Sequence, residues 1–123
     1  MSTLYHITTG QQLSEAKQTG EYHPPSLTAE GFVHLSQRHQ VLVVANLFYR
    51  NAADLVCLMI DTDKLRAPLK FESAAHPDGN AHAEIPLNEQ FPHLYGPLNM
   101  DAIIGVADLE ADDQGKFVAL KGE

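Results

Sequence analysis

Three pairs of residues place a histidine two positions before a hydroxyl-bearing side chain: His6 and Thr8, His34 and Ser36, His93 and Tyr95. Each pair lies in a segment that favours a β-strand, where residues two apart share one face. Neutral imidazoles and hydroxyls offer donors and acceptors, which suits the binding and positioning of a polar ligand. The pattern predicts that the pairs line one cleft. The alternative is three partly exposed sheet faces whose histidines are simply hydrogen-bonded.

A fourth predicted strand adds Lys70 and Glu72 on one face, and so supplies a carboxylate. The chain has no HExxH, CxxC or closely spaced histidine pair on one element, so we expect no metal site. It also has no GxGxxG, GxxxxGK[ST] or GxSxG, which removes the usual signals for dinucleotide-binding, P-loop and α/β-hydrolase chemistry. A Ser-His-Asp triad stays open, although no motif marks one.

The charge is unevenly distributed along the chain. Eight Lys and Arg stand against 16 Asp and Glu, which gives a net charge of −8 with histidines neutral. Residues 1–50 are balanced, so the acidity belongs to residues 51–123. This balance argues against bulk nucleic-acid binding, which needs a basic surface. It does not argue against one small-molecule or nucleotide ligand in a local pocket.

The 123 residues predict a single domain spanning 1–123. Cys57 is the one cysteine and lies in an apolar run, which indicates a buried thiol in a reducing compartment. The first residues lack the pattern of a signal peptide, and no stretch approaches 18 apolar residues. We therefore expect a cytoplasmic protein that does not cross a membrane.

The elements that must position these residues form an α+β fold with six or seven strands in mixed and antiparallel sheets and two N-terminal helices. Strands are expected over 4–8, 32–35, 55–60, 69–73 and 91–95, followed by a hairpin of 103–109 with 116–120. One helix should begin at the capping box Thr9-x-x-Gln12 and end near Gly20. A second should cover 37–49, with Ser36 as its N-cap.

Prolines and loop length add three expectations. Residues 22–26 should be extended or turn, because two prolines fix the backbone there. Pro92 should lie at the start or edge of its strand, where a missing donor is tolerated. Residues 74–90 should form a long loop that acts as a lid at the rim of the cleft.

Five segments stand out in order over residues 4–106: Tyr5-His6-Ile7-Thr8, Gly31-Phe32-Val33-His34-Leu35-Ser36, Val44-Ala45-Asn46-Leu47-Phe48-Tyr49, Asp54-Leu55-Val56 with Ile60-Asp61, and Phe91-Pro92-His93-Leu94-Tyr95-Gly96-Pro97-Leu98. Together they resemble the uncharacterised, mostly bacterial domain-of-unknown-function family 952. The resemblance implies an ADP-ribosyltransferase-like fold that binds NAD between two small sheets.

The same resemblance implies roles for individual residues. His6 would bond a ribose hydroxyl while its main chain meets the nicotinamide amide, and Glu72, or else Glu84, would stabilise an oxocarbenium-like state. The remaining roles are secondary: His34, Ser36 and Arg38 would orient the ribose or phosphates, His93 and Tyr95 would contact the acceptor or leaving group, and Thr8 would bind ligand. The expected activity is ADP-ribosyl transfer or NAD cleavage. A non-catalytic nucleotide-binding module and a hydrolase are the alternatives.

Overall fold

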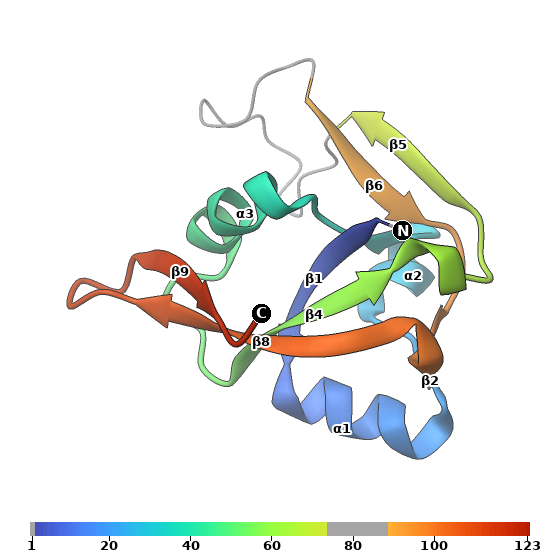
Figure 1. Cartoon of the computed structure of the whole chain (residues 1–123), viewed down its shortest axis with the longest axis horizontal. Coiled ribbons are helices and arrows are strands. Elements are labelled where there is room, and N and C mark those ends of the chain that lie inside the picture. Colours follow the sequence, from blue (N-terminus) through green and yellow to red (C-terminus); the bar gives the residue numbers. More distant parts are fainter. Residues whose placement is uncertain (1, 74–88) are drawn as a thin grey trace.

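The computed structural model describes residues 2–73 and 89–123, and its central element is a four-stranded antiparallel sheet. Its strands follow the order β1 (Thr3–Thr9), β4 (Leu55–Asp61), β8 (Ile103–Ala111) and β9 (Phe117–Lys121) (Figure 1). The apolar run at 55–60 forms β4, which pairs with β1 on one side and β8 on the other. The predictions of a central strand and of the C-terminal hairpin are confirmed.

A second sheet has the order β3 (Val33–His34), β6 (Gln90–Leu94), β5 (Leu69–Ser73). A short ladder of β2 (Glu21–Tyr22) with β7 (Leu98–Asn99) was not predicted. Every described strand pairing is antiparallel, so the expected antiparallel sheets are confirmed and no described pairing is parallel. Tyr5 on β1 forms an isolated antiparallel bridge with Ser36, just beyond β3. This bridge joins the two larger sheets.

Pro92 lies in the middle strand of the three-stranded sheet, not at an edge. The amide of Leu35 donates to the Pro92 carbonyl at 3.0 Å. Proline has no N–H to return the second bond, so the β3–β6 ladder ends at this point. The missing donor is tolerated because β3 is only two residues long.

The first helix, α1 (Gly10–Thr19), begins and ends where predicted. Thr9 Oγ1 accepts from the Gln12 amide at 3.1 Å, and Gly20 closes the helix at φ 89°. The second predicted helix differs at its start, which is a 3-10 turn over Arg38–Gln40 leading into α3 (Val41–Phe48). Gln37, not Ser36, caps that turn, because the main chain of Ser36 is taken by Tyr5.

A third helix, α2 (Pro25–Glu30), occupies part of the segment expected to be extended or turn. Pro24 is its N-cap and Pro25 its first residue. Proline is favoured at the first helical position because the N–H it lacks would have no helical partner there. The prolines therefore start a helix at this point instead of preventing one.

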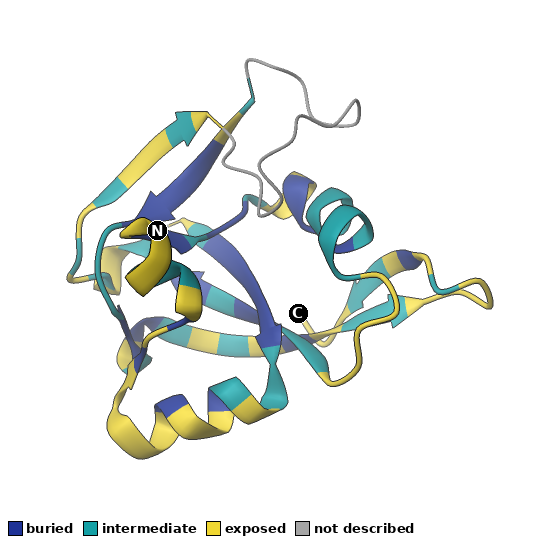
Figure 2. Cartoon of the chain, turned by 180° about the vertical axis from the view of Figure 1, so that it is seen from behind, coloured by how far each residue is buried: buried dark blue, intermediate teal, exposed yellow. Residues whose placement is uncertain are grey.

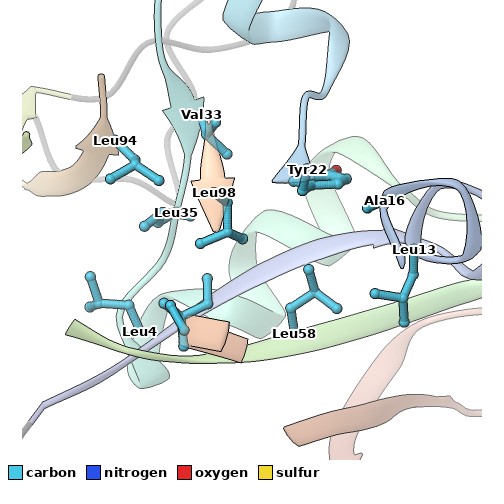
Figure 3. Close-up of a cluster of buried hydrophobic side chains, with 11 residues drawn as sticks. Leu4, Leu13, Ala16, Tyr22, Val33, Leu35, Leu58, Leu94 and Leu98 are labelled. Atoms are coloured by element: carbon cyan, nitrogen blue, oxygen red, sulfur yellow. The ribbon is translucent and has the colours of Figure 1, made fainter. Parts of the chain in front are cut away.

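Two hydrophobic clusters cover the two faces of the four-stranded sheet. One face packs against α1 and the three-stranded sheet, through a cluster that contains Leu4, Leu13, Leu35, Leu58 and Leu94 (Figure 3). The other packs against α3 and includes Cys57, which is buried with its pKa raised to about 12, so the predicted buried thiol is confirmed. Figure 2 shows the buried centre, whereas the outer side of α1 and much of β5 are exposed.

No helix within the described ranges is long and apolar enough to cross a membrane. The predicted lid, apart from its last two residues, and Glu84 lie outside the described residues.

Candidate functional site

A cavity of about 400 Å³ lies between β1 of the four-stranded sheet and β3 and β6 of the three-stranded sheet. His6, His34 and His93 all line it. Apolar side chains of α3 and β4, among them Phe48 and Leu55, form another wall. The volume lies within the usual range for small-molecule pockets, about 300–1,000 Å³. The expected convergence of the three histidines on one cleft is observed.

His6 is buried, 7% exposed, and both of its ring nitrogens are hydrogen-bonded. Nδ1 lies 2.5 Å from the His34 carbonyl oxygen, and Nε2 lies 2.8 Å from the Tyr22 hydroxyl. Burial lowers the pKa of His6 to about 4, so the ring is neutral at pH 7. Since a carbonyl only accepts, the neutral ring carries its proton on Nδ1.

The hydrogen bonds of His6 continue through three further side chains. The Tyr22 hydroxyl lies 2.8 Å from Thr8 Oγ1, which is 2.6 Å from Gln12 Oε1. Tyr22 and Thr8 are 3% exposed, and burial raises the pKa of Tyr22 to about 12. Gln12 does not complete the capping box that its spacing suggested, because its side chain bonds Thr8. This series of hydrogen bonds fixes the orientation of the His6 ring at the cavity.

The other two histidines are each held by a carboxylate. His34 Nε2 lies 3.0 Å from Glu30 Oε1, and His93 Nδ1 lies 2.9 Å from Glu72 Oε1. The Tyr95 hydroxyl donates to the same Glu72 oxygen at 2.5 Å. These bonds lower the pKa of Glu72, the Tyr95 bond being the larger cause. Glu72 is therefore a carboxylate anion at neutral pH, facing His93.

The predicted site residues divide into two groups. His6, Thr8, His34, Ser36 and His93 line the cavity. Two of the others, Glu72 and Tyr95, do not line it: Glu72 bonds His93, and Tyr95 bonds Glu72.

Arg38 is paired with a carboxylate outside the cavity. Its guanidinium makes a bidentate ion pair with Glu123, with Nε and a terminal nitrogen donating at 2.7–3.1 Å. It does not line the cavity, and the turn it begins is 3-10 rather than α-helical. Arg38 thus lies apart from the cavity, and its expected contact with phosphates stays a prediction.

One edge of β1 presents main-chain groups to the cavity. Tyr5 exchanges two main-chain hydrogen bonds with Ser36, at 2.8 and 2.7 Å, on the side away from β4. Hydrogen-bonding direction alternates along a strand, so Ile7 also faces that side, whereas His6 faces Leu58 of β4. Ile7, not His6, therefore supplies the main-chain donor and acceptor at the cavity.

Sequence reasoning missed Tyr22, Gln12 and Glu30, all of which line the cavity. Tyr22 had no strand pattern around it, because β2 is two residues long. Glu30 closes α2, and its spacing of four from His34 is the one signal that was available. The contact forms across Gly31, whose φ of 90° ends the helix.

The cavity has no positive side chain among its described lining residues other than histidines. Glu30 contributes a carboxylate, and His6 is neutral. Such a cavity suits a neutral or cationic group with hydrogen-bonding edges and disfavours a buried phosphate. Within residues 2–73 and 89–123, no group of three or more His, Cys, Asp or Glu side chains is placed to hold a metal ion.

The fold is shared with a solved structure from Caulobacter crescentus. The crystal structure of protein CC0527 is 30% identical and superposes with a TM-score of 0.77, covering 95% of this chain and 94% of that one. A double mutant of the same protein gives 29% identity and a TM-score of 0.76 over the same coverage. Its solution NMR structure gives 30% and 0.63, covering 94% and 90%.

No curated protein matches the chain. Residues 7–106 match the family described as "Protein of unknown function (DUF952)", a span that includes every histidine at the cavity except His6. The match covers most of the 123 residues, so the chain belongs to the DUF952 family.

Proposed function

We propose that the cavity binds NAD or an ADP-ribosylated compound and that the protein cleaves or transfers the ADP-ribosyl group. One observation carries the proposal: His6 and His34, from strands of two different sheets, meet at one cavity between those sheets. This is the arrangement that a resemblance to ADP-ribosyltransferases implies.

The charge of the cavity supports a nicotinamide end inside it. The nicotinamide ring of NAD is cationic, and the cavity offers Glu30 and a neutral His6 with no described Lys or Arg. The apolar wall with Phe48 and Leu55 suits an aromatic ring. The phosphates and adenosine then remain outside the cavity, because nothing described inside it would neutralise a phosphate.

The main chain of Ile7 supports recognition of the carboxamide. A primary amide has one acceptor oxygen and two donor hydrogens, and the main chain of Ile7, which bonds no described residue on the side away from β4, offers the matching N–H and C=O. His6 Nδ1 and Nε2 are both engaged within the protein, so this ring shapes the cavity and does not reach far into it.

Breaking the nicotinamide–ribose bond builds positive charge on the ribose, which a nearby carboxylate stabilises. Glu30 lines the cavity and Glu72 does not. We therefore transfer the role first given to Glu72 to Glu30. The bond's electron pair leaves with nicotinamide, which becomes neutral.

A second candidate is a non-catalytic module that binds the same ligand. It is favoured by the position of Glu72, whose reactive oxygen is occupied by His93 and Tyr95 outside the cavity. The two candidates share the binding site and differ only in turnover.

The experiment combines calorimetric titration of NAD and ADP-ribose with chromatographic detection of released nicotinamide. Glu30→Gln should lower release by about 10²-fold with binding retained. Glu21→Gln is the matched control, since Glu21 also pairs with a histidine, His23, but does not line the cavity. Binding without release favours the second candidate. Absence of both binding and release overturns the proposal.

A further inference from the structure

His93 is the most enclosed ionisable side chain at the cavity, with a residue exposure of 2%. It lies on β6 between two aromatic neighbours. Phe32 stacks on it with ring centroids 4.1 Å apart, and His34 meets it edge-on at 5.6 Å. These contacts hold the plane of the His93 ring.

That orientation assigns different surroundings to its two nitrogens. Nδ1 faces Glu72, whose carboxylate can only accept, so Nδ1 carries the proton in the neutral ring. Nε2 then holds a lone pair. It makes no hydrogen bond to any residue in the described part of the chain, while the ring lines the cavity. A carboxylate at Nδ1, and an Nε2 that no described residue hydrogen-bonds, is the arrangement of a general base.

Tyr95 holds the carboxylate of the His93–Glu72 pair in place. Its hydroxyl donates to the Glu72 oxygen that also accepts from His93. The Glu72 side chain is 39% exposed, but two donors bond the same carboxylate oxygen and hold it in place. Lys70 Nζ lies over the Tyr95 ring, 5.1 Å from its centroid.

We propose that His93 is the general base of the cavity, held by Glu72 and Tyr95 as positioning residues, and that it activates an oxygen nucleophile, water or an alcohol. This inference rests on the proposed function and assigns its acceptor class. The nucleophile's O–H proton moves to Nε2, and its oxygen forms the new bond to the ribose C1 carbon. The C–N bond breaks, its electron pair leaves with nicotinamide, and the proton on His93 returns to solvent.

The surroundings of His93 keep it unprotonated at neutral pH. Burial lowers its pKa from 6.5, the hydrogen bond to Glu72 opposes that shift, and the neighbouring His34 adds to it. Glu30, which is bonded to His34, raises the pKa of His93, and Phe32 and Tyr95 bring no charge at this pH. A base needs its free lone pair at the working pH, and the net direction meets that need.

The experiment measures NAD binding and nicotinamide release in parallel for two variants. His93→Gln should keep NAD affinity within a few-fold and lower release by about 10²-fold. Glu72→Gln removes the negative charge but retains an acceptor oxygen. It should lower kcat, leave KM for NAD unchanged and move the acid limb of the kcat profile to lower pH, because the charge that raised the His93 pKa is gone.

Glu110→Gln is the matched control, because Glu110 pairs with Lys121 on the distant hairpin and does not line the cavity. It should match the parent protein throughout. Circular dichroism melts of each variant establish that it is folded, and Glu72→Gln keeps the test decisive if His93→Gln does not fold.

Nitrogen-15 NMR of the histidine rings gives a readout that needs no turnover. We expect the Nδ1-protonated form for His93, and a larger population of the other form in Glu72→Gln. Protonated Nε2 in the parent protein overturns the inference, as does unchanged release by both variants alongside intact NAD binding. Failure of the parent protein to bind NAD overturns the proposed function instead. The NMR result then still decides whether His93 Nε2 carries the free lone pair that a base needs.

Discussion

His34 and His93 lie directly opposite each other in the β3–β6 register, with ring centroids 5.6 Å apart and planes crossing at 78°. Each is hydrogen-bonded to its own carboxylate, Glu30 for His34 and Glu72 for His93. The site therefore contains two histidine–carboxylate pairs side by side. Because the rings are close, His34 lowers the pKa of His93.

Tyr22→Phe should destabilise the fold by about 1–3 kcal/mol. The hydroxyl is buried and joins His6 Nε2 to Thr8 Oγ1, so its removal leaves two buried polar atoms without that partner. Urea denaturation monitored by circular dichroism measures the loss. Tyr49→Phe is the control, since Tyr49 also lines the cavity but its hydroxyl bonds no described residue. Equal losses for the two variants would contradict the account.

Stability should fall as pH decreases from about 6.5 to about 4 because of His6. Its pKa is about 4 in the folded protein and 6.5 as a model value, so the unfolded chain binds a proton that the folded one does not. Above pH 6.5 His6 is neutral in both states and no stability is lost. At about pH 4 the loss of stability reaches roughly 3 kcal/mol.

Denaturant unfolding of the parent and of His6→Gln at a series of pH values checks this. The variant should show a flatter dependence over the same range. His23→Gln, at a histidine whose side chain is 57% exposed, should retain the parent slope. A parent-like slope in His6→Gln would assign the effect to other groups.

Arg38→Gln should leave ligand binding unchanged and cost at most about 1 kcal/mol of stability. The guanidinium pairs with Glu123 with both side chains partly exposed, 47% and 32%, and it lies outside the cavity. Calorimetric titration of NAD against the variant is the measurement. A tenfold or greater loss of affinity would restore the phosphate-binding role that the sequence suggested.

Asn46→Ala should destabilise the fold by about 1–3 kcal/mol, because two main-chain groups lose their partner. Asn46 Nδ2 donates to the Phe117 carbonyl at 2.9 Å, and its Oδ1 accepts from the Phe117 amide at 2.7 Å. The side chain thus extends the edge of β9 and ties α3 to it. Thermal unfolding of this variant is compared with that of Gln114→Ala, an exposed change in the same hairpin. Equal losses of stability in the two variants would refute the role given to Asn46.

The elements predicted most accurately are those in which one local signal dominates. The apolar run through Cys57 gave β4, and Thr9 with Gly20 bounded α1. Helix α2 was missed because prolines were interpreted only as helix breakers, whereas at the first turn they fit. Pro92 was misplaced because strand order is a tertiary property that no local pattern encodes.

The cavity could be anticipated in its histidines but not in their partners. Alternation along strands placed His6 and His34 on definite faces, and the fold brought those faces together. The carboxylate at the cavity, Glu30, comes from a helix that was not expected. Glu72 was correctly placed on a strand. It faces His93 because β5 pairs with β6, and the sequence does not indicate that pairing.

The two sheets that form the walls of the cavity are joined by two main-chain hydrogen bonds between Tyr5 and Ser36. A ligand that contacts both walls of the cavity would connect the two sheets at a second place, beside these hydrogen bonds. Binding free energy then opposes separation of the sheets. Occupancy of the cavity is therefore readable at the amide protons of Tyr5 and Ser36, whose exchange with solvent slows as the walls are held together.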